Sequence, residues 1–239
     1  MKLNDKYYFI FDRLIRSVYP KHCPVCDEII PLNRDYCKCS DFDNIKLSDD
    51  YCRHCGHDIK NCCCGGENSV YLPDVAAVYV YGGRIRSDIL SFKFNYDKYL
   101  AKKLGAEMAE RCAKAYCDVD FDYVTFVPMT KEAVKKRGYN QSQLLAEVVA
   151  EKFFIESKAL LLKAADTAAQ HSLSGKERIN NLKNSIILND NVQLKGKNIL
   201  LCDDVKTTGT TLKSCVDVLI KAGASKVCCI CVAVSDFNR

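Results

Sequence analysis

One stretch, Ile199–Leu212, constrains the fold of this chain more than any other. Its first four residues are apolar, as in a short strand that is buried on both faces of a parallel sheet. Two carboxylates follow, Asp203 and Asp204, and a run rich in threonine then leads into a helical pattern. Such a run presents backbone N–H groups at a helix N-terminus, and Gly209 lets the backbone approach an anion closely. The stretch therefore predicts a phosphate site at the carboxyl end of a buried strand.

The two acids need a separate explanation. At this position Asp203 and Asp204 are placed to hold sugar hydroxyls, or a Mg²⁺ ion bound to the same ligand. An ordinary strand, turn and helix with a threonine cap requires neither of them. A nucleotide-binding P-loop is the less favoured reading, because the stretch has no Gly-Lys-Ser/Thr.

This order of strand, Asp-Asp and Thr-Thr-Gly-x-Thr resembles the segment with which type I phosphoribosyltransferases bind 5-phosphoribosyl 1-pyrophosphate (PRPP). The resemblance implies that Asp203 and Asp204 are the catalytic carboxylates that face the ribose 2′- and 3′-hydroxyls. It also implies that Mg²⁺ accompanies PRPP. The residues expected at the phosphate are Lys206, Thr207, Thr208, Gly209, Thr210 and Thr211. Lys206 departs from the usual apolar or variable residue and would add a cation near the anion.

Nine of the sixteen cysteines lie between Cys23 and Cys64, mostly in closely spaced pairs. Without an export signal we expect a cytoplasmic, reducing location, where clustered cysteines indicate metal rather than disulfides. Four pairs would supply two structural zinc sites. The sequence leaves open how the pairs combine, and whether Cys62, Cys63 or His57 completes the second set. The expected ligands are Cys23, Cys26, Cys37, Cys39, Cys52, Cys55, Cys62 and Cys64.

Composition changes between Glu67 and Pro73, which predicts two domains. Residues 1–70 would form an amphipathic helix plus a cysteine-rich zinc-binding domain, and residues 71–239 an α/β domain. No run is apolar for long enough to span a bilayer. In the second part strands and helices alternate, which predicts a parallel sheet flanked by helices. The first expected strand begins at Val75 and is closed by a glycine turn at Gly82-Gly83; the others are Tyr123–Val127, Ala159–Leu162, Ile199–Cys202 and Lys226–Val234. The expected helices are Arg84–Asn95, Lys98–Tyr116, Ser142–Phe154, Glu177–Leu182 and Leu212–Ala222.

A second loop is expected at the same edge of the sheet, where Pro128 and Met129 follow a strand. A basic cluster comes next. It suits either a solvated helix face or contact with a polyanion, and the phosphate loop favours the second reading. Its members are Lys131, Lys135, Lys136 and Arg137.

The features that carry a further resemblance are Val127-Pro128, the Arg-Gly-Tyr-Asn-Gln-Ser run at 137–142 and the cysteine pairs. In these features the chain resembles the ComF family of competence-associated proteins. Two positions depart from that family: Lys163 replaces the usual Arg, and Met129-Thr130 replaces a second proline. By resemblance, the polar segment 167–178 is a loop that closes over PRPP, with Gln170 and Arg178 as its contacts. Arg178 is explained equally well by a pair with a helix neighbour.

Two functions follow from these resemblances. In the first, the protein binds PRPP with Mg²⁺ and transfers the phosphoribosyl group to an unknown acceptor, as an enzyme linked to DNA uptake in natural competence. In the second, it is a non-catalytic PRPP sensor that binds single-stranded DNA or competence-machinery proteins. Residues 73–239 carry the net positive charge of the chain, which suits nucleic acid. No residue stands out as a general base, so positioning would supply most of any catalysis.

Overall fold

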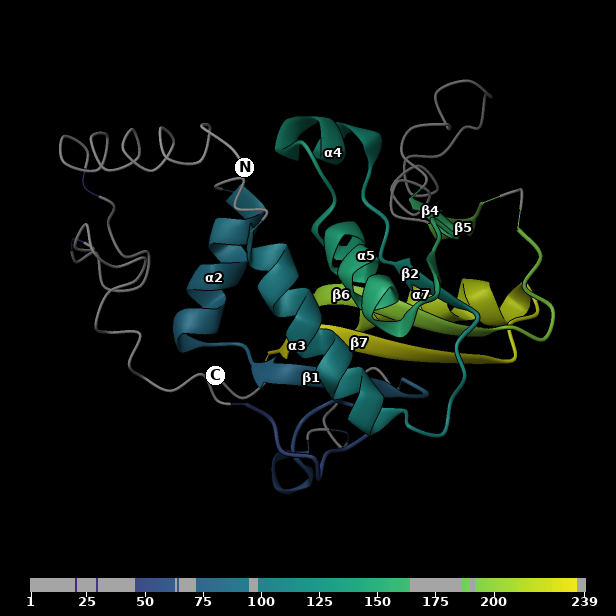
Figure 1. The fold of residues 1–239 in the computed structure, drawn as a ribbon, viewed down its shortest axis with the longest axis horizontal. Coiled ribbons are helices and arrows are strands. Elements are labelled where there is room, and N and C mark those ends of the chain that lie inside the picture. The colour runs from purple at the N-terminus through teal and green to yellow at the C-terminus, as the bar shows by residue number, and fades with distance from the viewer. Residues whose placement is uncertain are drawn as a thin grey trace, which may run out of the picture.

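The computed structural model describes Pro20, Ile29 and residues 46–62, 64, 72–94, 99–163, 186–189 and 192–235. Its centre is a five-stranded sheet in the order β1-β7-β6-β2-β3, and all four strand pairs are parallel (Figure 1). The acid pair therefore lies in β6, the middle strand. The strands of this sheet are β1 (Val75–Val80), β2 (Tyr123–Phe126), β3 (Glu156–Ser157), β6 (Asn198–Lys206) and β7 (Lys226–Val234).

Helices cover both faces of the sheet. One face carries α2 (Gly83–Phe94), α3 (Tyr99–Ala115) and α5 (Gln141–Phe153), as Figure 1 shows. The other face packs against α7 (Thr210–Lys221) and against an antiparallel pair, β4 (Leu161–Lys163) with β5 (Ile186–Leu188). Two short elements complete the described fold: α4 (Lys131–Arg137) and a 3₁₀ turn, η2 (Ile59–Asn61).

The predicted parallel sheet flanked by helices is confirmed, but the expected strand Ala159–Leu162 lies outside it, as β4 in an antiparallel pair with β5. Most expected elements end within a residue or two of the observed bounds. The expected strand Ile199–Cys202 is an exception, since β6 continues to Lys206. The polar end is held in the sheet because β7 pairs with it as far as Val234. The two acids thus belong to the strand itself rather than to the turn after it. The expected N-terminal helix and the 167–178 loop with its following helix lie outside the described residues, apart from Pro20.

Two apolar cores sandwich the sheet. The first joins the buried sides of α2, α3 and α5 to the strands, with Phe92 and Met108 fully buried. The second joins α7 to the opposite face through Leu212 and Leu219. Burial of apolar side chains on both faces explains why the strands are nearly continuous apolar runs.

We expect Gly105→Ala to destabilise the fold, although alanine has the higher helix propensity. A Cβ atom at Gly105 of α3 would lie 2.7 Å from the Cβ of Val148 on α5, too close for two carbon atoms. The higher helix propensity would raise the free energy of unfolding by about 1 kcal/mol, and overpacking would lower it by about 1–3 kcal/mol. We therefore expect a net loss of stability of up to about 2 kcal/mol. Chemical unfolding measures it. Gly82→Ala is the matched control, because an added Cβ there meets nothing within 4 Å; equal stability of the two variants would contradict the packing argument.

Candidate functional site

Each carboxylate of the acid pair contacts a different helix. Ser142 Oγ of α5 donates a hydrogen bond to Asp203 Oδ1 at 2.9 Å, and the backbone N–H of Asp204 donates to the same oxygen at 2.9 Å. Lys93 Nζ of α2 lies 2.9 Å from Asp204 Oδ2. Asp204 is 8% exposed. The pair is therefore held by two helices that pack on the same face of the sheet.

The two acids differ in how readily they ionise. Burial, and after it the charge of Asp204, raises the pKa of Asp203 to about 7. The hydrogen bonds from Ser142 and from the Asp204 amide act in the opposite direction, as does the charge of Lys93. Asp203 is thus a carboxyl group that titrates near neutral pH, a property that is common at functional sites.

Asp203→Asn should stabilise the fold, and more so as the pH rises. The pKa of Asp203 is raised from 3.8 to about 7 in the folded chain. Its contribution to stability is therefore complete below the unfolded pKa and is lost as the pH rises through the folded pKa. Since one pKa unit corresponds to about 1.4 kcal/mol, the gain from asparagine should reach about 2–4 kcal/mol at about pH 8.5 and shrink toward about pH 5. Urea unfolding at both pH values measures it, with Asp118→Asn as the exposed control. A gain that does not depend on pH would refute the prediction.

The segment predicted to bind phosphate lies between β6 and α7. Gly209 has a φ of 86° and immediately precedes the first residue of α7. Thr208 Oγ1 accepts from the Thr210 N–H at 3.3 Å, so a side chain closes the turn. A helix N-terminus with four exposed threonine hydroxyls around it is a favourable site for an anion. The exposed threonines are Thr207, Thr208, Thr210 and Thr211.

Lys206 is placed differently from these threonines. It is the last residue of β6, only 3% of the residue is exposed, and its carbonyl oxygen accepts from the Ser235 N–H at 2.9 Å. Lys206 therefore belongs to the buried end of the sheet rather than to the exposed turn. Its suggested role as a cation beside the phosphate stays a prediction.

The second predicted loop follows β2 with Pro128 and Met129. Thr130 Oγ1 accepts from the Ala133 N–H at 3.1 Å and caps α4. Arg137, at the other end of α4, donates to Gln141 Oε1 at 2.6 Å, and its guanidinium lies 5.4 Å from the centre of the Phe94 ring. The basic cluster is thus mostly on an exposed short helix. Its exposed members are Lys131, Lys135 and Lys136.

A chain of hydrogen bonds joins this loop to the acid pair. Asn140 Nδ2 donates to the carbonyl oxygen of Val127 at 3.0 Å, and Asn140 Oδ1 accepts from the Ser142 N–H at 3.0 Å. Ser142 in turn donates to Asp203. The Asn-Gln-Ser part of the sequence motif therefore has a structural role, because it fixes the end of β2 relative to the end of β6.

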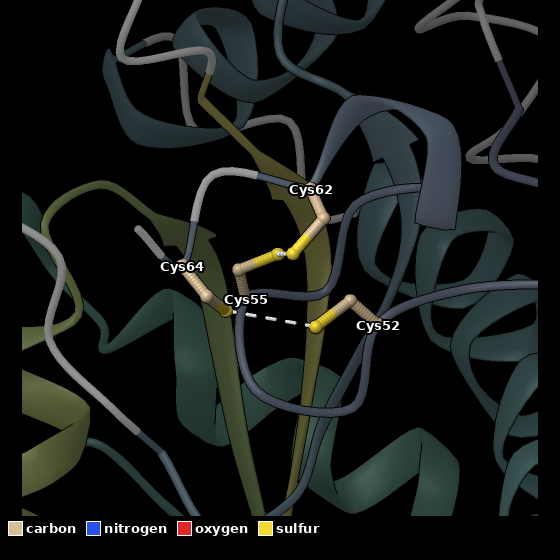
Figure 2. A group of neighbouring side chains, drawn as sticks. All are labelled: Cys52, Cys55, Cys62 and Cys64. Carbon is tan, nitrogen blue, oxygen red and sulfur yellow. Dashed lines mark hydrogen bonds between the residues drawn. The ribbon is translucent and has the colours of Figure 1, made fainter. Parts of the chain in front are cut away.

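Four cysteine sulfurs come together in the described part of the chain. Those of Cys52, Cys55, Cys62 and Cys64 all lie within 4.8 Å of one another (Figure 2). The Cys52–Cys64 and Cys55–Cys62 sulfur pairs are 3.6 and 3.9 Å apart. Tetrahedral zinc with Zn–S bonds of about 2.3 Å requires sulfurs about 3.8 Å apart, so the group fits a zinc ion.

Of the predicted zinc ligands, the last two pairs are therefore brought together in one group. Burial raises the pKa of Cys52, but the His54 and Cys55 amides and the neighbouring thiols more than offset this and lower it to about 7. The first predicted set of zinc ligands, which comprises Cys23, Cys26, Cys37 and Cys39, lies outside the described residues. Cys63 lies outside them too.

The cysteine group is attached to the edge of the sheet at β1. The Leu47 N–H donates to the Val78 carbonyl at 2.9 Å, and Arg53 forms an ion pair with Asp74 at 3.1 Å. His57 is 1% exposed, and its Nε2 lies 3.3 Å from the Ser235 carbonyl oxygen. These contacts cover an edge strand that would otherwise be open to pairing with other chains.

The remaining predicted contacts are Gln170 and Arg178, which lie outside the described residues. Sequence reasoning missed Lys93 and did not assign a role to Ser142. Ser142 could have been found, since it closes the Arg-Gly-Tyr-Asn-Gln-Ser run. Lys93 gives no signal of its own in the sequence, because it lies in an amphipathic helix far from Asp204 along the chain.

Among the described residues, no helix combines the length and apolar character needed to cross a bilayer. Residues 133–237 match the family model of the phosphoribosyl transferase domain. The matched part contains α5, β6, the threonine turn, α7 and β7. It therefore includes both acids.

Over 80 residues the chain is 31% identical to "Competence protein ComFC" of Bacillus subtilis (strain 168), an alignment that covers 34% of this chain and 33% of that protein. It thus spans about a third of this curated relative. Glutamine PRPP amidotransferase from B. subtilis is 24% identical, with a TM-score of 0.39 over 55% of this chain and 26% of that one. Adenine phosphoribosyltransferase from Saccharomyces cerevisiae is 15% identical, with a TM-score of 0.41 over 60% of this chain and 73% of that one.

Proposed function

We propose that this chain, a ComF-family protein with a phosphoribosyltransferase-type domain, binds PRPP with Mg²⁺ at the carboxyl end of β6. In this proposal the turn from Thr207 to Thr211 binds the 5′-phosphate, and Asp203 and Asp204 face the ribose hydroxyls. One observation supports this proposal above all. The central strand β6 contains two carboxylates that Ser142 and Lys93 hold in place, and an exposed threonine turn follows directly at the start of α7.

The acids also suit the metal that would accompany the ligand. Mg²⁺ prefers oxygen ligands and usually binds through one or two carboxylates plus substrate phosphates. When bound, the ion would take up negative charge on the departing pyrophosphate. Pro128 and Met129, with Lys136 and Arg137 after them, stand at the end of the neighbouring strand β2, where they could bind that group.

The reaction that we propose is phosphoribosyl transfer to an acceptor that is not identified. The bond between C1 of the ribose and the pyrophosphate oxygen breaks, and pyrophosphate leaves with the bonding electrons. A bond from the acceptor to C1 forms in its place. The chain's own contribution would be to orient the sugar and to stabilise developing charge, which together supply large rate effects in other enzymes.

The test is thermal unfolding with PRPP and Mg²⁺, followed by an assay of pyrophosphate release with candidate acceptors. Ligand that binds only the folded chain raises its melting temperature by mass action. An unchanged melting curve would contradict the proposed binding. A raised melting temperature without pyrophosphate release would favour a sensor over an enzyme.

A second function is suggested by the surface beside the site. Three exposed lysines on α4 lie next to Arg137, whose guanidinium packs over the exposed ring of Phe94. Cations beside an aromatic ring are typical of surfaces that bind single-stranded nucleic acid. We infer that this face could bind single-stranded DNA or competence-machinery proteins in the cytoplasm. Measuring DNA binding across salt concentrations tests it, since phosphate contacts give a steep salt dependence.

We also propose that zinc in the cysteine groups is structural. All four positions of a tetrahedral ion would be filled by the sulfurs of Cys52, Cys55, Cys62 and Cys64, which leaves no position for a substrate. The division into a zinc-binding domain at 1–70 and a phosphoribosyltransferase-like domain at 71–239 remains part of this proposal.

A further inference from the structure

The acid pair has a partner that belongs to no part of the sequence motif. Lys93 comes from the last turn of α2, and its ammonium lies 2.9 Å from Asp204 Oδ2. The side chain of Lys93 is 24% exposed and that of Asp204 is 11% exposed, so the pair is largely removed from water. The attraction within such a pair is little screened by water, and a single buried charge left without its partner is costly.

We propose that Lys93 is a positioning residue of the PRPP site, which fixes Asp204 through one carboxylate oxygen and leaves the other to accept from the sugar. This inference rests on the proposed function. It adds a residue that neither the phosphate turn nor the acid motif contains.

The backbone that carries Lys93 is itself firmly held. The preceding residue, Phe92, is fully buried, and its carbonyl oxygen accepts a hydrogen bond from the Tyr139 hydroxyl. The rings of Phe92 and Tyr139 also pack with their centres 5.8 Å apart. Because Tyr139 precedes the Asn140–Ser142 link to Asp203, one short segment sets the position of both acids.

Lys93 also reduces the net negative charge of the site. PRPP carries several phosphate charges, and two neighbouring carboxylates would repel it. An ammonium group in contact with Asp204 offsets one of these charges. A lysine here therefore lets the site keep two hydroxyl-binding acids without rejecting an anionic ligand.

The test is isothermal titration of the full-length, metal-loaded protein with PRPP and Mg²⁺. Lys93→Met and Lys93→Gln should each weaken binding about tenfold or more, because both remove the charge that holds Asp204. Lys93→Arg should restore binding to within about threefold of the native protein. Glutamine retains a hydrogen-bond donor for Asp204. If Lys93→Met does not fold, the PRPP affinity of Lys93→Gln therefore measures the effect of losing the charge.

Lys103→Met is the matched control. Lys103 is an exposed lysine that pairs with Asp88 at 3.8 Å, so the variant has the same change of net charge without a contact to the acids. Its affinity for PRPP should equal that of the native protein.

A second probe separates positioning from a general loss of positive charge. The affinities for ribose 5-phosphate and for inorganic phosphate are compared in each variant. Lys93→Met should weaken the binding of ribose 5-phosphate more than that of inorganic phosphate, because only the sugar would contact the two acids. Equal weakening of both would overturn the positioning role.

The outcomes distinguish this inference from the proposed function. A native protein that binds no PRPP would overturn both. A native protein that binds PRPP while the Met and Gln variants bind equally well, or more tightly, would overturn the role of Lys93 alone. Tighter binding would mean that Lys93 competes with the ligand for Asp204.

Discussion

Replacing both acids, Asp203→Ala with Asp204→Ala, is expected to abolish the rise in melting temperature that PRPP and Mg²⁺ produce in the native protein. In the proposed complex both carboxylates would face the ribose, and the variant would lose their charge-assisted hydrogen bonds to the ligand. Losing them should weaken binding by about a hundredfold or more, which removes a shift that depends on mass action. Thermal unfolding with and without ligand measures the effect.

The matched control is Asp118→Ala with Asp120→Ala, which removes two exposed acids at the opposite end of β2. This variant should keep the full shift. The double variant at the site should remain folded, because removing the buried Asp203 carboxylate relieves a cost near neutral pH that offsets the loss of the Lys93–Asp204 pair. A ligand-induced shift of native size in the Asp203/Asp204 variant would show that PRPP binds elsewhere.

Loss of one sulfur from the cysteine group should have the second large effect. Cys55 is 3% exposed and belongs to the group that fits zinc. We expect Cys55→Ser to lower the zinc content by about one ion per chain and the melting temperature by about 10 °C or more, because metal binding in small sites supplies folding free energy. Elemental analysis and thermal unfolding of the same preparations measure both quantities.

Cys117→Ser is the control for this experiment, because Cys117 is exposed and lies outside the group. It should retain native zinc content and stability. The Cys55 variant should also associate more readily, since the segment that covers β1 would loosen and expose an edge strand. If Cys55→Ser kept both its zinc and its melting temperature, the proposed metal centre would be wrong.

Local patterns in the sequence were enough to predict the sheet, its helices and the acid pair. A run such as Lys226–Val234 is apolar throughout, and only a strand buried on both faces explains it. The helix α3 was equally clear from the spacing of Leu104, Met108 and Cys112. These features depend on near neighbours in the chain.

The rest depends on contacts between distant segments. The length of β6 is set by pairing with β7, so the polar residues after Cys202 gave no hint that the strand continues. Lys93 reaches Asp204 only because α2 packs beside the end of the sheet. The grouping of Cys52 and Cys55 with Cys62 and Cys64 follows from a turn that several spacings would allow. Strands as short as β3 and β5 lack a recognisable period.

The most direct test of this account is a crystal structure of the protein with PRPP and Mg²⁺. We expect the 5′-phosphate against the backbone amides from Thr207 to Thr211, and the ribose hydroxyls within hydrogen-bonding distance of Asp203 and Asp204. PRPP bound at another surface, with the threonine turn empty and both acids still engaged only by Ser142 and Lys93, would contradict it.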